Sequence, residues 1–146
     1  MTKNTATAHW QGDLKTGKGE VGLGNKAFTG QYSFHSRFEE GTGTNPEELI
    51  AAAHAACFSM AFSNQLASNG FTPTSVHTTA TVTLAKTDAG FGITTIALTC
   101  DADVPNVTEA KFFELAEAAK TGCPISKALA AVPTITLTAN LKKAAA

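Results

Sequence analysis

The sequence has little arginine, little cysteine and no long apolar run. Eleven basic and twelve acidic residues give a formal net charge of −1, and Arg37 is the single arginine. Without an excess of positive charge nothing attracts a phosphate backbone, so we expect no nucleic-acid partner. The most apolar run, residues 49–62, is interrupted by His54 and is shorter than the ~20 residues that span a bilayer. We therefore expect no membrane association.

The chain has three cysteines, Cys57, Cys100 and Cys123. They are few, and an odd number cannot all pair, so they do not suit the disulfide framework of a small secreted protein. No charged-then-apolar segment of the signal-peptide type precedes them. We expect a cytoplasmic protein whose thiols stay reduced unless they react. The 146 residues are 43% apolar and contain no long polar linker, which predicts one domain, 1–146, with a substantial core. The alanine tail, 144–146, is expected to fray.

Alternation and turn residues predict an α+β arrangement. We expect strands at residues 5–10, 19–23, 32–38, 75–85, 91–104 and 134–141. Asn45 as N-cap and Pro46 at the first helical position predict a helix over 46–67, which is apolar on nearly every face and should be buried. Two more helices are expected at 109–120 and 124–131. The order is βββ-α-ββ-αα-β, with helices packed on antiparallel sheet.

Cys57 and Cys123 are the candidate reactive thiols. Cys57 falls near the middle of the apolar helix, where a cysteine is either a small core residue or a functional thiol. Cys123 precedes Pro124 at a helix start, where backbone N–H groups and the helix dipole stabilise a thiolate. Cys100 lies on the apolar face of its strand, and we assign it to the core.

Arg37 ends the third predicted strand, and its planar fork suits a carboxylate or a thiolate better than a lysine would. Its natural partners are Glu47 and Glu48 in the first turn of the long helix, although both also suit the helix dipole. His54 lies three residues before Cys57 on one helix face. It is therefore either a hydrogen-bonded core histidine or half of a Cys–His nucleophile pair.

Patterns for metal and nucleotide binding are missing. Neither C-x-x-C nor H-E-x-x-H occurs, and the closely spaced glycines at 22–24 and 41–43 do not extend into G-x-G-x-x-G or a P-loop. We expect no metal and no cofactor.

Five segments, in order along almost the whole chain, resemble the OsmC/Ohr family of thiol peroxidases, and most closely its OsmC branch. They are YSFHSRFE (32–39), GTNPEELIAAAHAACFSM (43–60), GFTPT (70–74), DAGFGITTIAL (88–98) and GCPISKAL (122–129). The resemblance implies an intertwined α+β homodimer with antiparallel sheets wrapped around a long buried central helix. It also implies an enzyme of oxidative or osmotic stress defence that reduces organic hydroperoxides, and hydrogen peroxide less efficiently.

By position, the resemblance assigns roles to four residues. Cys57 matches the family's peroxidatic cysteine, and Cys123 matches its resolving cysteine. Arg37 matches the arginine that activates the thiolate, and Glu47 matches the glutamate that pairs with this arginine. Cys100 matches no functional position. The resemblance further implies a dithiol or a lipoylated protein as reductant, and no metal, flavin or haem.

Glu47 and Cys57 are ten residues apart on one predicted helix, which corresponds to roughly 15 Å of rise. They cannot meet within one copy of that helix. If both serve one site, a second subunit must supply one of them, so we expect an obligate dimer with two shared sites.

An apolar pocket at the site would favour bulky organic hydroperoxides. We expect its walls to include Phe34, Phe38, Phe58 and Met60.

Two other functions stay open for the sequence. One is a Cys57–His54 acyl-transferase or hydrolase, and the other is a small-ligand binding module whose thiols are only structural.

Overall fold

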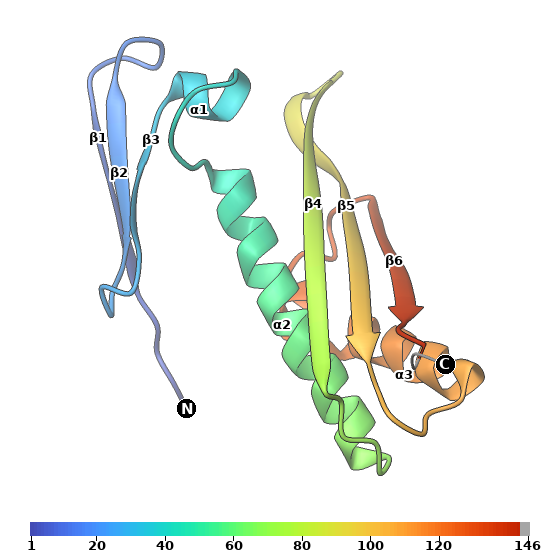
Figure 1. Cartoon of the computed structure of the whole chain (residues 1–146). Helices are drawn as coiled ribbons and strands as arrows, with labels where there is room; N and C mark the ends of the chain where they lie inside the picture. Colours follow the sequence, from blue (N-terminus) through green and yellow to red (C-terminus); the bar gives the residue numbers. More distant parts are fainter. Residues whose placement is uncertain (144–146) are drawn as a thin grey trace. The chain divides into compact units, whose positions relative to one another are not determined.

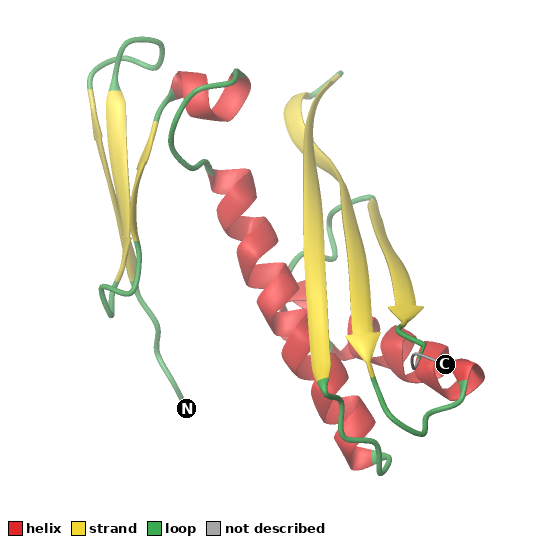
Figure 2. Cartoon of the chain, viewed as in Figure 1, coloured by secondary structure: helices red, strands yellow, loops and turns green. Residues whose placement is uncertain are grey.

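The computed structural model describes residues 1–143, so the alanine tail at 144–146, with its expected fraying, lies outside the described residues. The elements are β1 (Ala6–Gln11), β2 (Lys18–Leu23), β3 (Thr29–Tyr32), α1 (Phe34–Phe38), α2 (Pro46–Ser68), β4 (Ser75–Thr87), β5 (Gly90–Asp103), α3 (Glu109–Gly122), α4 (Pro124–Ala128) and β6 (Thr134–Leu141) (Figure 1, Figure 2). The chain divides into two compact units, residues 1–49 and 50–146. The expectation of a single domain stays a prediction.

The first unit contains an antiparallel sheet of β1, β2 and β3. Its cross-strand pairs alternate between two faces, with His9 opposite Glu20 on one and Trp10 opposite Gly19 on the other. Gly19 also pairs with Tyr32 on β3. A Cβ on Gly19 would lie 2.5 Å from the Tyr32 ring and 2.8 Å from the Trp10 ring. Glycine therefore lets the two rings approach, with their centroids 5.4 Å apart.

The third strand is shorter than predicted, and a helix follows it. Instead of one strand over 32–38, the chain forms β3 up to Tyr32 and then helix α1 over Phe34–Phe38. The cause is a local capping box. Ser33 Oγ accepts the N–H of Ser36 at 3.1 Å, and Ser36 Oγ accepts the N–H of Ser33 at 2.8 Å. These bonds pair the backbone N–H groups at the start of the helix. They outweigh the preference for a strand that the apolar–polar alternation indicated.

The second unit packs helices against a sheet of order β4–β5–β6, and α2 runs along this sheet in Figure 1. The predicted hairpin of β4 and β5 is confirmed. One hydrophobic core joins α2, β5 and α3 through Phe58, Phe62, Leu66, Ile96, Leu98, Cys100, Ala102, Val104, Phe112, Leu115, Ala116 and Ala119. Cys100 is fully buried, which confirms its assignment to the core.

Strand β6 pairs with β5 in parallel, from Thr95 opposite Thr134 to Ala102 opposite Leu141. The second sheet is therefore mixed, and the expectation of purely antiparallel sheet is wrong here. A parallel neighbour requires a crossover connection, and α3 with α4 provides it. Alternation of apolar and polar residues predicts the faces of a strand but not its direction.

Helix α2 is continuous over Pro46–Ser68 and begins as predicted, with Asn45 Oδ1 accepting the N–H of Glu48 at 2.8 Å. Past its first turn, its buried side chains recur at every fourth residue, at His54, Phe58, Phe62 and Leu66. The opposite side is open in the single chain, where Met60 is 75% exposed. Burial on nearly every face is therefore not reached within one chain. Neither this helix nor any other in residues 1–143 is both long and apolar enough to cross a membrane.

Phe112 and Phe113 are neighbours on α3, but Phe112 is fully buried in this core and Phe113 is 47% exposed. Replacing each in turn therefore tests the described packing. We predict that Phe112→Ala lowers the free energy of unfolding by about 3–5 kcal/mol, since it leaves a cavity in the core. The matched change Phe113→Ala should cost about 1 kcal/mol or less. Urea unfolding followed by circular dichroism measures both, and equal losses would contradict the described packing.

Candidate active site

Short-range hydrogen bonds bring Arg37 and Glu47 face to face. Arg37 lies on α1, and Ser36 on the same helix donates its hydroxyl proton to the Thr44 carbonyl oxygen at 2.7 Å. Asn45 Nδ2 donates to the Ser36 carbonyl oxygen at 3.0 Å. These two bonds tie α1 to the residues that begin α2, and so fix Arg37 beside the first turn of that helix.

The connection between α1 and α2 requires glycine at two positions. Gly43 has a φ of +119°, and a Cβ there would lie 2.6 Å from the Gln31 carbonyl oxygen. A Cβ on Gly41 would lie 2.7 Å from the carbonyl carbon of His35. Because Cβ atoms do not come so close to backbone, only glycine allows the chain to turn back this tightly.

Arg37 and Glu47 form a bidentate ion pair. Arg37 Nη2 lies 2.7 Å from Glu47 Oε1, and Nε lies 3.2 Å from Oε2. The Glu47 side chain is 11% exposed and that of Arg37 is 36% exposed. The carboxylate is therefore the more buried partner, and it orients the more exposed guanidinium. Arg37 Cζ also lies 5.2 Å from the centre of the Phe38 ring. The other candidate partner, Glu48, accepts a hydrogen bond from Thr44 Oγ1 at 2.7 Å instead.

A cavity of about 260 Å³ opens beside this pair, and Arg37 is one of its lining residues. Its apolar lining comes from Trp10, Leu14, Tyr32, Phe34, Phe38 and Pro46. Phe34 and Phe38 thus line a pocket as predicted. Phe58 and Met60 belong to the second unit, where Phe58 is fully buried and Met60 is 75% exposed, so their place in this pocket stays a prediction. The cavity can receive an organic group next to a guanidinium.

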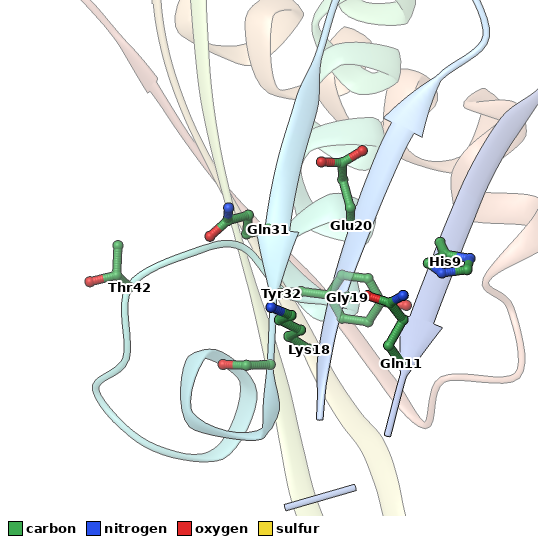
Figure 3. Close-up of a pocket in the computed structure, with 9 residues that line it drawn as sticks. His9, Gln11, Lys18, Gly19, Glu20, Gln31, Tyr32 and Thr42 are labelled. Carbon is green, nitrogen blue, oxygen red and sulfur yellow. The ribbon is translucent and has the colours of Figure 1, made fainter. Parts of the chain in front are cut away.

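A larger open cavity of about 540 Å³ lies on the face of the first sheet that carries His9 and Glu20. Figure 3 shows its polar lining, which includes Lys18 and Gln31 from the neighbouring strands. None of the four predicted site residues lines it. No cysteine is among its lining residues.

Cys57 and Cys123 meet in the second unit, where their sulfur atoms lie 2.9 Å apart although 66 residues separate them in the chain. Cys57 lies in the middle of α2, and Cys123 immediately precedes α4, with Pro124 at the first helical position as predicted. Both thiols are free. Cys123 is fully buried, whereas Cys57 is partly accessible. If one sulfur is oxidised, the other is already within reach.

The surroundings shift the two thiols in opposite directions. Burial raises the pKa of the Cys57 thiol, and its hydrogen bond with Cys123 adds to the rise. Burial also raises the pKa of Cys123, but its interactions with the Cys57 thiol and with the polar groups of Ser126 outweigh burial, so this pKa is lowered. Within the described part of the second unit, no positive charge contributes to the pKa of Cys57. A cation brought next to this thiol from elsewhere would lower its pKa.

His54 lies one turn before Cys57 on α2 but bonds to another residue. Its side chain is fully buried, and Nε2 lies 2.7 Å from Ser126 Oγ on α4. Burial lowers the pKa of His54, so the ring is neutral at pH 7. Of the two interpretations from sequence, the hydrogen-bonded core histidine is the correct one.

Sequence reasoning did not single out Ser126, Trp10 or Tyr32 as residues of the site. Trp10 and Tyr32 are the only tryptophan and tyrosine of the chain, and this rarity was the available signal. For Ser126 no signal existed, because 72 residues separate it from His54.

The four predicted residues thus form two pairs, Arg37 with Glu47 in the first unit and Cys57 with Cys123 in the second. One pair presents an oriented cation, and the other presents two adjacent thiols. Residues 1–143 contain no group of three or more His, Cys, Asp or Glu placed to hold a metal ion.

Known proteins similar to this chain carry related names. A sequence profile of the family described as OsmC-like protein matches residues 39–138. Peroxiredoxin OsmC of Escherichia coli (strain K12) is 54% identical over 136 residues, which cover 92% of this chain and 94% of that protein.

Solved structures agree on the fold. The organic hydroperoxide resistance protein OhrB of Bacillus subtilis, at 26% identity, has a TM-score of 0.68 and covers 94% of this chain and 98% of its own. An OsmC-like protein from Mycoplasma pneumoniae, at 19% identity, has a TM-score of 0.76 with coverages of 97% and 99%. The α+β fold class predicted from the sequence is confirmed.

Proposed function

The chain belongs to the OsmC-like protein family and is a cysteine-based peroxidase, and we propose that it reduces organic hydroperoxides with Cys57 as the peroxidatic and Cys123 as the resolving residue. The observation that carries the assignment is the 2.9 Å between two free thiols on separate elements. The name of the Bacillus subtilis relative, an organic hydroperoxide resistance protein, supports this substrate class. A Cys57–His54 hydrolase is disfavoured, because His54 bonds to Ser126.

The proposed reaction has three steps. The Cys57 thiolate attacks the distal peroxide oxygen, so that an S–O bond forms as the O–O bond breaks, and the departing alkoxide takes up a proton to leave as alcohol. Cys123 then condenses with the Cys57 sulfenic acid, releasing water and leaving a disulfide. A dithiol, such as a lipoylated protein, restores both thiols by exchange. This cycle fits a reducing cytoplasmic location.

Arg37 supplies the positive charge that Cys57 lacks in its own unit. Burial raises the pKa of Cys57, and a guanidinium next to the sulfur would offset that rise. A guanidinium has five N–H donors, and Glu47 accepts from two of the nitrogens that carry them. The other donors are available for a thiolate and for the peroxide. Glu47 keeps the fork oriented so that these donors point in one direction.

The aromatic cavity beside Arg37 explains the substrate class. An alkyl or aryl group that enters about 260 Å³ of mainly apolar lining gains about 25 cal/mol for each Å² of apolar surface removed from water. Hydrogen peroxide has no apolar surface to bury, so it gains nothing from this lining. We expect the cavity to favour organic hydroperoxides for this reason.

The proposed site is shared between two subunits. Glu47 and Cys57 are ten residues apart on the continuous helix α2, a rise of roughly 15 Å. The Arg37–Glu47 pair of one subunit would therefore act on the partner subunit's Cys57. A second copy would also cover the open side of α2, where Met60 is 75% exposed.

The two cysteines should fail in different ways when replaced. We expect Cys57→Ser to abolish the reduction of cumene hydroperoxide, because no sulfenic acid can form. Cys123→Ser should consume about one peroxide per site and then stop, because no disulfide follows. Peroxide consumption with a dithiol reductant measures both variants. Full turnover in Cys57→Ser would overturn the assignment.

The neighbouring acids Glu47 and Glu48 provide a matched test of the cation. Glu47→Gln weakens a charge-assisted pair by about 1.5–3 kcal/mol, so we expect the peroxide step to slow by about 10–100-fold. The half-maximal pH of this step should rise, since a less oriented Arg37 stabilises the thiolate less. Glu48→Gln should leave both values near wild type. Rapid-mixing kinetics across pH measure the rate and the half-maximal pH of both variants. If Glu47→Gln and Glu48→Gln gave the same values, Glu47 would not have the proposed role.

Mixing two inactive variants tests the shared site. Arg37→Ala and Cys57→Ser, unfolded together and refolded, should form heterodimers with one intact site each. Random pairing then restores about a quarter of wild-type activity. If each site were built within one chain, no heterodimer would contain an intact site, and the mixture would stay inactive.

A further inference from the structure

The proposed reaction uses neither His54 nor Ser126, yet these two residues form a buried hydrogen bond next to the cysteine pair. Ser126 is 9% exposed and His54 is fully buried, and their side chains meet at 2.7 Å. Ser126 is the third residue of α4 and Cys123 is the N-cap of that helix, and the polar groups of Ser126 help to lower the pKa of Cys123. Cys123 in turn lies 2.9 Å from Cys57. The start of α4 therefore connects the two bonds, because it carries both Ser126, which meets the imidazole, and Cys123, which meets the peroxidatic sulfur.

The Ser126 hydroxyl has one proton to donate, and the tautomer of His54 decides its direction. Nδ1 of His54 is buried and has no hydrogen-bond partner among the described residues. A proton on Nδ1 would leave a buried N–H donor unpaired, which is rare and costly. A proton on Nε2 is donated to Ser126 Oγ. We assign the proton to Nε2 on this ground.

The Nε2 tautomer directs the Ser126 hydroxyl proton to Cys123. Because the serine oxygen already accepts from His54, its own proton is free for the sulfur of Cys123. A sulfur that accepts such a bond is stabilised as thiolate. The charged residues that line a cavity of about 330 Å³ together with Ser126 are Lys120 and Lys127.

We propose that His54 is a positioning residue for the resolving step and that, through Ser126, it prepares Cys123 to attack oxidised Cys57. This inference rests on the proposed function. In that step the Cys123 sulfur attacks the sulfenic sulfur of Cys57, and the S–S bond forms as the S–O bond breaks. The Cys123 sulfur is oxidised and the sulfenic sulfur reduced. The proton lost by Cys123 balances the one gained by the departing hydroxide, which leaves as water, and His54 keeps its own proton.

A single-turnover experiment separates the two oxidation steps. The reduced protein is mixed with one equivalent of cumene hydroperoxide per site and quenched at intervals over a range of pH. Dimedone trapping reports the Cys57 sulfenic acid, and mass spectrometry of the alkylated peptides reports the Cys57–Cys123 disulfide. The variants are Ser126→Ala, His54→Leu, and His54→Gln, whose amide can still donate to Ser126. Ser59→Ala is the matched control, because it removes another hydrogen bond of α2, 2.7 Å to Thr78 Oγ1.

We expect Ser126→Ala and His54→Leu to form sulfenic acid at the wild-type rate. Disulfide formation should slow by about tenfold or more, with its half-maximal pH raised, since a bond to a charged sulfur is lost. His54→Gln should recover most of the rate, and Ser59→Ala should match wild type.

Three results would count against the inference in distinguishable ways. Wild-type disulfide formation and pH profile in Ser126→Ala would overturn it, and this variant decides alone if His54→Leu does not fold. No recovery in His54→Gln relative to a folded His54→Leu would reduce His54 to a packing role and also overturn it. If the wild-type protein forms no sulfenic acid, the proposed function itself fails and the inference falls with it.

Discussion

Helix α2 holds Glu47 in its first turn and Cys57 ten residues further on, and a rigid helix does not bring these two positions together. The rest of the site is arranged around this separation. Hydrogen bonds of Ser36 and Asn45 fasten the Arg37 fork to the beginning of the helix. Cys57 lies in the middle of α2, and Cys123 meets it from the start of α4. The proposed site needs both Glu47 and Cys57, so it requires the α2 helices of two subunits.

The thiol pair carries a second constraint, because at a sulfur separation of 2.9 Å an anion on one sulfur strongly disfavours an anion on the other. The two thiols therefore titrate as a coupled pair. With burial raising the pKa of Cys57 and hydrogen bonds lowering that of Cys123, the resting preference favours an anion at the resolving position. In the proposed shared site, the guanidinium of Arg37 would favour the anion at Cys57 instead. Once Cys57 is oxidised in the proposed cycle, only Cys123 can carry the negative charge, and it acts as the nucleophile.

Local signals in the sequence predicted much of this fold. Asn45 and Pro46 marked the start of α2, and Cys123 and Pro124 marked the start of α4, because caps and first-turn prolines depend on neighbours in the chain. Cys100 was assigned to the core from alternation alone. The same kind of local reasoning limited the candidate partners of Arg37 to Glu47 and Glu48.

The features that were not predicted from the sequence depend on contacts that neighbouring residues in the chain do not reveal. Ser33 and Ser36 turned the end of an expected strand into a helix, since the apolar alternation there fits either state. The predicted antiparallel direction of β6 was wrong, although two helices between β5 and β6 are the usual sign of a parallel crossover. His54 and Ser126 were out of reach, because only the folded chain brings together residues 72 positions apart.

The parallel docking of β6 has a consequence for how the chain folds. The β4–β5 hairpin is local and can form early, whereas β6 reaches β5 only after α3 and α4 have closed a long loop. Cys123 lies within that loop, so it arrives at Cys57 as part of a late, non-local event. Before this event Cys57 has no thiol partner. In the proposed cycle, a sulfenic acid formed on Cys57 at that stage would have no thiol to condense with and would be open to irreversible oxidation, so completion of folding would protect Cys57.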